Sequence, residues 1–144
     1  MKNSDITTHK FTAILSKKVE PGKIMNALAH MSIGIVANNT DKIKEMNFGD
    51  YVDKDNGVHP SLSNNSYVIL RADNGNQIRT VRNMAISKGI PFIDFTNTMQ
   101  EGTYVEQLER TKNTPELELE YYGIVLFGKI EEVNELTRKF SLWR

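Results

Sequence analysis

The chain lacks cysteine altogether, and this absence excludes several kinds of chemistry. Disulfide bonds, thiolate nucleophiles and cysteine-ligated metal sites all require residues that the sequence does not contain. The chain also has no excess of one charge, because 18 Lys and Arg residues balance 18 Asp and Glu residues. A neutral protein has no overall attraction for nucleic acid or for an anionic membrane, so RNA binding would need a local basic patch.

Long apolar runs are also missing. No run approaches the roughly 18 residues that suggest a membrane span, and the amino-terminal "MKNSDITTHK" lacks the apolar stretch of a signal peptide. We therefore expect a cytoplasmic protein that makes no contact with a membrane. The 144 residues are 39% hydrophobic, which predicts one globular domain over residues 1–144 with a core of its own.

Short apolar segments alternate with segments of helical periodicity. Strands are predicted at Lys10–Ser16, Ser66–Ala72 and Ile90–Thr96, and helices at Lys23–Ala37 and Asp73–Gly89. This order predicts an α/β fold with right-handed crossovers, a parallel sheet and helices on both faces. The continuous apolar run in the third strand predicts its burial on both faces.

The remaining segments are less regular. Phe48–Ser66 is rich in Gly, Asn, Asp, Pro and Ser, which indicates a long surface connection or a small hairpin. A short helix is expected at Thr103–Arg110 and a fourth strand at Tyr121–Gly128. The closing segment Lys129–Trp143 is predicted to be a helix, whose inner face carries Ile130, Val133, Leu136 and Phe140.

Polar side chains follow the predicted strands at the end where ligands bind in open parallel sheets. They are Lys17 and Lys18 after the first strand, Arg71 in the second, and Asp94, Thr96 and Thr98 in and after the third. Gly22 and Lys23 open the first helix, whose free N–H groups could hold a phosphate or a carboxylate. A solvated lysine is the alternative for Lys23.

Asp94 lies inside an apolar run, where an unpaired carboxylate would cost several kcal/mol. It is therefore either a cap that anchors the following loop or a group that orients water in catalysis. Lys23, Asn26 and His30 fall on neighbouring turns of the first helix. His30 is either a base or ligand contact, or a hydrogen-bonded core residue.

No metal or cofactor motif is present. His9, His30 and His59 do not have the spacing of metal ligands. The sequence has no phosphate-binding loop, no dinucleotide fingerprint and no nucleophile elbow. We expect no metal and no cofactor.

Several segments resemble the type II peptidyl-tRNA hydrolases of archaea and eukaryotes. They are "KFTAILSKKVEPGKIMNALAHMSIG", "PFIDFTNT" and "YYGIVLFG". A closer resemblance, which includes "GVHP" and "FGKIEEVNELTRKFSLWR", is to a largely bacterial family with that fold, the domain of unknown function two thousand. The resemblance implies a three-layer α/β/α domain with a mixed four-stranded sheet, an antiparallel fourth strand and often a dimer.

The resemblance also implies roles for single residues. Lys23, Asp94 and Thr98 match the catalytic lysine, aspartate and threonine of the hydrolases, and His30 matches a histidine further along the helix. The hydrolases' glutamine is replaced by Ala27, with Asn26 beside it. Asn26, His30 and Thr96 are the candidate substrate contacts.

Three functions remain open. One is hydrolysis of an ester or amide in a small anionic or nucleotide-linked substrate, in which Asp94 orients water and Lys23 stabilises the developing negative charge. The second is a non-catalytic module that binds a small anion or a protein partner. The third is peptidyl-tRNA hydrolysis, which requires that the basic residues near the sheet edge, Lys17, Lys18, Arg71, Arg79 and Arg82, form one patch for tRNA. A homodimer is expected in each case.

Overall fold

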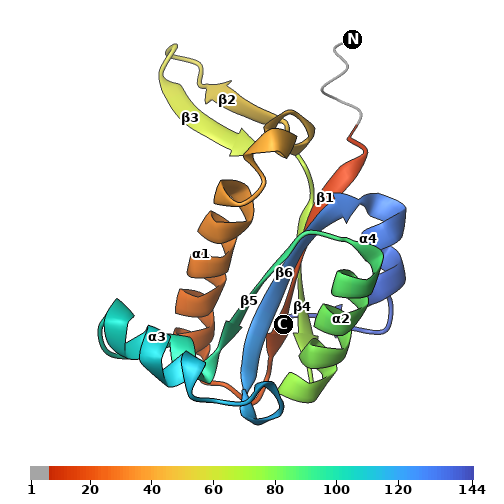
Figure 1. The fold of residues 1–144 in the computed structure, drawn as a ribbon. Coiled ribbons are helices and arrows are strands. Elements are labelled where there is room, and N and C mark those ends of the chain that lie inside the picture. The colour runs from red at the N-terminus through yellow and green to blue at the C-terminus, as the bar shows by residue number, and fades with distance from the viewer. Residues whose placement is uncertain (1–6) are drawn as a thin grey trace.

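A five-stranded mixed sheet forms the centre of the computed structural model, which describes residues 7–144 (Figure 1). In spatial order its strands are β5 (Phe92–Thr96), β6 (Tyr121–Lys129), β1 (His9–Ser16), β4 (Tyr67–Ala72) and β7 (Ser141–Leu142). β1 and β4 are parallel, whereas β6 runs antiparallel to both of its neighbours, β1 and β5. The α/β class and the antiparallel direction of the strand at Tyr121–Gly128 are thus confirmed.

Helices cover both faces of this sheet and make three layers. α1 (Pro21–Ala37) lies on one face, and α2 (Gly75–Lys88) and α4 (Ile130–Thr137) lie on the other (Figure 1). Each face has its own apolar core. Successive strand residues point to opposite faces, so Leu15 of β1 packs in the α1 core and Ile14 packs in the α2 core.

Local sequence explains where the two long helices begin and end. Pro21 occupies the first turn of α1, where a missing N–H costs nothing. Asn74 caps α2 by accepting a hydrogen bond from the Gln77 N–H, and Gly89 ends it with a φ of 67°. Gly75 is required for packing, because a Cβ there would lie 2.8 Å from the main-chain oxygen of Tyr121 in β6.

The prediction that Ile90–Thr96 is buried on both faces was wrong. β5 is an edge strand in which only Phe95 and Thr96 are buried. The strand buried on both faces is β6, whose residues Tyr121–Phe127 are all buried. The cause is topological, because β6 pairs between β1 and β5 and so occupies the central position.

The long helix expected at Lys129–Trp143 is also shorter than predicted. α4 ends at Thr137, and Ser141–Leu142 turn back to form β7 along the free edge of β4. The main-chain N–H of Trp143 donates to Ile69 O across 2.9 Å. The unpaired main-chain groups of an edge strand favour this pairing over another helical turn, and the sheet has five strands rather than four.

The segment Phe48–Ser66 contains a hairpin, one of the two alternatives considered. β2 (Phe48–Val52) and β3 (Val58–Ser63) pair antiparallel in a sheet of their own, which extends beyond the end of α1 (Figure 1). The short elements are η2 (Thr40–Met46), η3 (Asn97–Met99), α3 (Tyr104–Lys112) and η4 (Glu116–Glu118).

Within residues 7–144, no helix has the length and apolarity that a membrane crossing requires. The prediction from the polar amino terminus concerns a segment whose first six residues lie outside the described part of the chain.

One buried polar atom offers a test of the core. Thr12 is fully buried, and its Oγ1 has no hydrogen-bond partner among residues 7–144. An unsatisfied buried hydroxyl costs about 1–3 kcal/mol, so we expect Thr12→Val to raise the free energy of unfolding by about 1 kcal/mol in urea titrations. The matched control is Thr137→Val, because the Thr137 hydroxyl donates to Val133 O and its removal should destabilise the protein. A less stable Thr12→Val variant would contradict this account.

Candidate functional site

The predicted site residues lie on two faces of the sheet. Lys23, Asn26 and His30 belong to α1, on the face where Ile93 and Phe95 of β5 also pack. Asp94 points the other way and contacts Arg82 of α2. Asp94 therefore does not share a face of the sheet with the three residues of α1.

The polar row on α1 faces solvent. Asn26 and His30 are exposed and Lys23 is half-buried. None of these three side chains forms a hydrogen bond or an ion pair with another of the described residues. The His30 ring lies 6.1 Å from the ring of Phe95, but its exposure shows that it is not a core histidine.

Asp94 is held by an ion pair. Arg82 Nε donates to Asp94 Oδ2 across 2.7 Å, and the two side chains are 27% and 15% exposed. The guanidinium also lies over the ring of Phe92 at 5.5 Å. Burial lowers the pKa of Arg82, but the hydrogen bond and charge of Asp94 outweigh it, so the pKa is raised. The carboxylate thus anchors α2 to the edge strand β5.

Thr96 and Thr98 are buried at the carboxyl end of β5. Thr98 Oγ1 lies 2.8 Å from the hydroxyls of both Thr96 and Thr111. Arg110 of α3 also donates to Thr98 O across 3.2 Å. These contacts fix η3 against α3, and both threonine hydroxyls have partners within the protein.

A second polar network on the α2 face was not predicted from the sequence. Arg79 Nε donates to Glu116 Oε2 across 2.8 Å, and the Tyr121 hydroxyl donates to the same oxygen across 2.7 Å. Arg79 also donates to Leu119 O and lies over the Tyr121 ring. Together these bonds tie the connection before β6 to α2. No sequence signal marks them, because Arg79 and Glu116 lie 37 positions apart.

The same network shifts the pKa values of two of its members. Hydrogen bonds from Tyr121 and Arg79 lower the pKa of Glu116. Burial, and then the hydrogen bond to Glu116, raises the pKa of Tyr121 to about 12. At neutral pH the network therefore consists of a carboxylate, a guanidinium and a neutral phenol, which is a stable arrangement and not a proton-transfer pair.

The parallel strands β1 and β4 end side by side, where the Lys17 N–H donates to Ala72 O. The chain leaves β1 for α1 on one face and leaves β4 for α2 on the other (Figure 1), and such a divergence is the usual place for a ligand in an α/β sheet. Lys17 Nζ and Asp73 Oδ1 lie 3.0 Å apart just beyond the two strand ends. The hydrogen bond and charge of Lys17 lower the pKa of Asp73.

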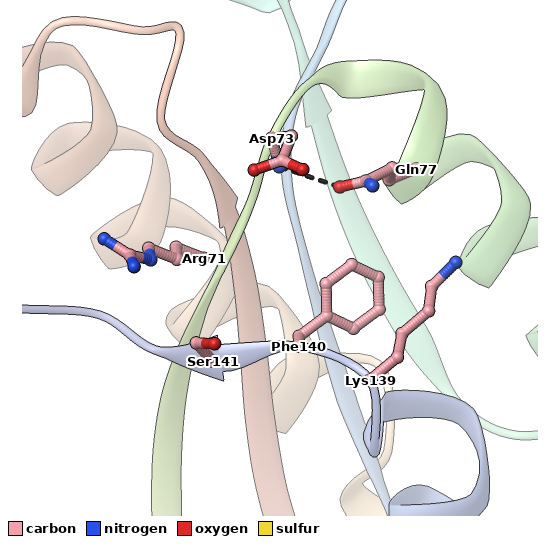
Figure 2. Close-up of a pocket in the computed structure, with 6 residues that line it drawn as sticks. All are labelled: Arg71, Asp73, Gln77, Lys139, Phe140 and Ser141. Atoms are coloured by element: carbon pink, nitrogen blue, oxygen red, sulfur yellow. Dashed lines mark hydrogen bonds between the residues drawn. The ribbon is translucent and has the colours of Figure 1, made fainter.

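Two small cavities lie near these strand ends. One, of about 150 Å³, is shown in Figure 2 and is lined by Arg71, Asp73, Gln77, Lys139, Phe140 and Ser141. There Gln77 Oε1 accepts from the Asp73 N–H across 2.7 Å, and the Arg71 guanidinium points away from that pair (Figure 2). The other lies at the amino end of α2 and is called the α2 cavity.

The α2 cavity has a volume of about 260 Å³ and lies at the first turn of α2. Its lining comprises Lys18, the run Asn74–Asn76, Arg79, Leu117, Leu119 and Glu120. Sites for drug-sized ligands measure about 300–1,000 Å³, so this space suits a small ion or a single ligand group. Among residues 7–144, no cluster of three or more His, Cys, Asp or Glu residues could hold a metal ion.

The Glu116 network makes stability depend on pH in a defined direction. Because the pKa of Glu116 is lowered from 4.5, its contribution is present above that value and is lost as the pH falls through the folded-state pKa. We expect Glu116→Gln to lower the melting temperature near pH 7 and to approach the wild type as the pH falls below the lowered pKa of Glu116. Glu118→Gln should match the wild type throughout, because the exposed Glu118 side chain in the same η4 turn forms no hydrogen bond or ion pair with another of residues 7–144. A constant difference between Glu116→Gln and wild type would refute the assignment.

Comparison with known proteins gives a family but no activity. A solved structure of a protein of unknown function from Agrobacterium tumefaciens superposes with a TM-score of 0.80 at 18% identity, over 96% of this chain and 100% of that one. No protein with a curated description matches. The model of a family described as a protein of unknown function (DUF2000) matches residues 9–144. The chain therefore belongs to the DUF2000 family.

Proposed function

We propose that the protein is a non-catalytic module that binds a small anion in the α2 cavity. The observation that carries this proposal is that Lys18 and the first turn of α2 line the same cavity. Lys18 has no carboxylate within 4.0 Å among the described residues. A helix amino terminus and an unpaired cation together favour a phosphate or carboxylate group.

The first turn of α2 is suited to this role. It contains no acidic residue, and Asn74 caps only the Gln77 N–H. The N–H groups of Gly75 and Asn76 have no acceptor within residues 7–144. Glu120 is the one carboxylate that lines the cavity, which favours a ligand of low charge over a polyphosphate.

The charge distribution favours a small anion over tRNA. Of the five basic residues near this edge, three are neutralised within the protein: Lys17 by Asp73, Arg79 by Glu116 and Arg82 by Asp94. A tRNA ligand requires many free cations along its phosphates. We therefore propose that the chain has a fold like that of the type II peptidyl-tRNA hydrolases without their activity, consistent with Ala27 in place of the glutamine.

Ester or amide hydrolysis is less well supported. It would require Lys23, Asp94 and Thr98 around one substrate, but the Asp94 carboxylate is paired with Arg82 on the α2 face and the Thr98 hydroxyl is enclosed by two other threonines. A carboxylate in such an ion pair is poorly placed to orient water.

Titration with inorganic phosphate, followed by amide NMR, tests the binding proposal. We expect the amide chemical shifts of Lys18 and Asn74–Gln77 to change until the site is saturated, with a millimolar dissociation constant. Lys18→Glu should raise this constant at least about tenfold. Lys112→Glu, at an exposed position in the last turn of α3, is the matched control and should bind as the wild type does. Shifts that do not saturate, or binding that survives Lys18→Glu, would overturn the proposal.

Hydrolysis is checked with simple acyl esters and peptidyl-tRNA. We expect purified protein to release no more product than buffer does, because within residues 7–144 the predicted catalytic residues Lys23, Asp94 and Thr98 do not converge. Turnover that falls in both Lys23→Ala and Asp94→Asn would establish the hydrolase in place of the binding module.

A further inference from the structure

The outer face of α1 is unusual for a surface helix because it carries no charge. Eight residues of α1 are exposed, and none of them is Asp, Glu, Lys or Arg. The outer side of α4, by contrast, exposes Glu131, Glu132 and Glu135. A solvent-facing helix surface is normally charged, whereas depletion of charge is typical of the centre of a protein interface.

Large apolar side chains are exposed on the same face. Met25 is 65% exposed and Ile33 is 70% exposed. The elements at the two ends of α1 also expose apolar side chains. The hairpin exposes Val52, Val58 and Leu62, and α3 exposes Tyr104, Val105 and Leu108. Figure 1 shows α1, the hairpin and α3 on one side of the sheet, with α2 and α4 on the other.

Five of the eight exposed residues of α1 form one regular row, which we call the α1 row: Pro21, Met25, Ala29, Ile33 and Ala37. The other three, Gly22, Asn26 and His30, lie beside it and are also uncharged. The residues of the α1 row are spaced four apart and so make one ridge along the helix. The row is symmetric about Ala29, with a large apolar residue one turn away on each side. A two-fold axis at Ala29 would therefore place Met25 of each copy against Ile33 of the other, as an isologous contact requires.

We propose that the α1 row is the centre of a homodimer interface in which α1 packs antiparallel against α1 of a second copy. A small residue at the centre lets the two helices approach closely, and packing of two such ridges is the commonest class of helix contact. The uncharged row and the zero net charge of the chain leave no electrostatic repulsion between copies. A charged partner would find no complementary group on the row.

A stable dimer needs a larger contact area than the exposed face of α1 provides. Such a dimer uses about 20–30 residues of each copy, which is more than the eight exposed residues of α1. The hairpin and α3 must supply the rest. An isolated two-stranded hairpin is marginal in water, and this one keeps Val52 and Val58 at 63% and 62% exposure, so contact with a second copy would stabilise it.

The oligomeric state and its response to one charge test this inference. We expect sedimentation at about 100 µM to give twice the monomer mass of 16.4 kDa. Ala29→Glu brings two carboxylates together at the axis and should weaken the dimer more than about 100-fold. Ile86→Glu is the matched control, because Ile86 is an exposed apolar residue of α2 on the opposite face, and it should remain dimeric.

Cross-linking gives a second readout that does not depend on a disruptive variant. The chain has no cysteine, so Ala29→Cys introduces a single thiol per copy at the proposed axis. We expect it to form an intermolecular disulfide rapidly under mild oxidation, since the two residues would lie within bonding range, whereas Ile86→Cys should not. A monomeric wild type, a dimeric Ala29→Glu variant or equal cross-linking of the two thiols would overturn the proposal.

Discussion

The structure depends on one constraint, the insertion of antiparallel β6 between β1 and β5. Both cores use this strand, because Val125 and Phe127 pack towards α1 while Ile124 and Leu126 pack towards α2. Gly123 lets the layers close, since a Cβ there would lie 2.8 Å from side-chain atoms of Leu15 and Met31. The same insertion moves β5 to the edge of the sheet, where Asp94 becomes an anchor for α2.

Internal charge pairing then determines which groups remain available for a ligand. Arg79 and Arg82 hold the connection before β6 and the edge strand to α2, and Lys17 pairs with Asp73 beyond the ends of β1 and β4. These pairs leave Lys18 beside the amino end of α2 as the group best placed to meet an anion. The charges fix the layers on one face of the sheet, whereas the opposite face, around α1, depends on apolar and small residues.

Sequence patterns predicted the elements that are fixed locally. Pro21 marks the start of α1 and Gly89 the end of α2. The strands predicted at Lys10–Ser16 and Ser66–Ala72 correspond to β1 and β4. The edge position of β5 and the formation of β7 depend on strand pairing, which local periodicity does not encode. Asp94 stayed ambiguous for the same reason, because its partner Arg82 becomes a neighbour only when α2 packs on the sheet.

The contact at Gly75 has a consequence for how this fold can vary among relatives. The first turn of α2 rests directly on the main chain of Tyr121, so any side chain there would push the helix end away from the sheet and alter the spacing of its free N–H groups. The proposed anion site therefore requires glycine at position 75. We expect a relative with a larger residue there to keep the scaffold and to lack the proposed site.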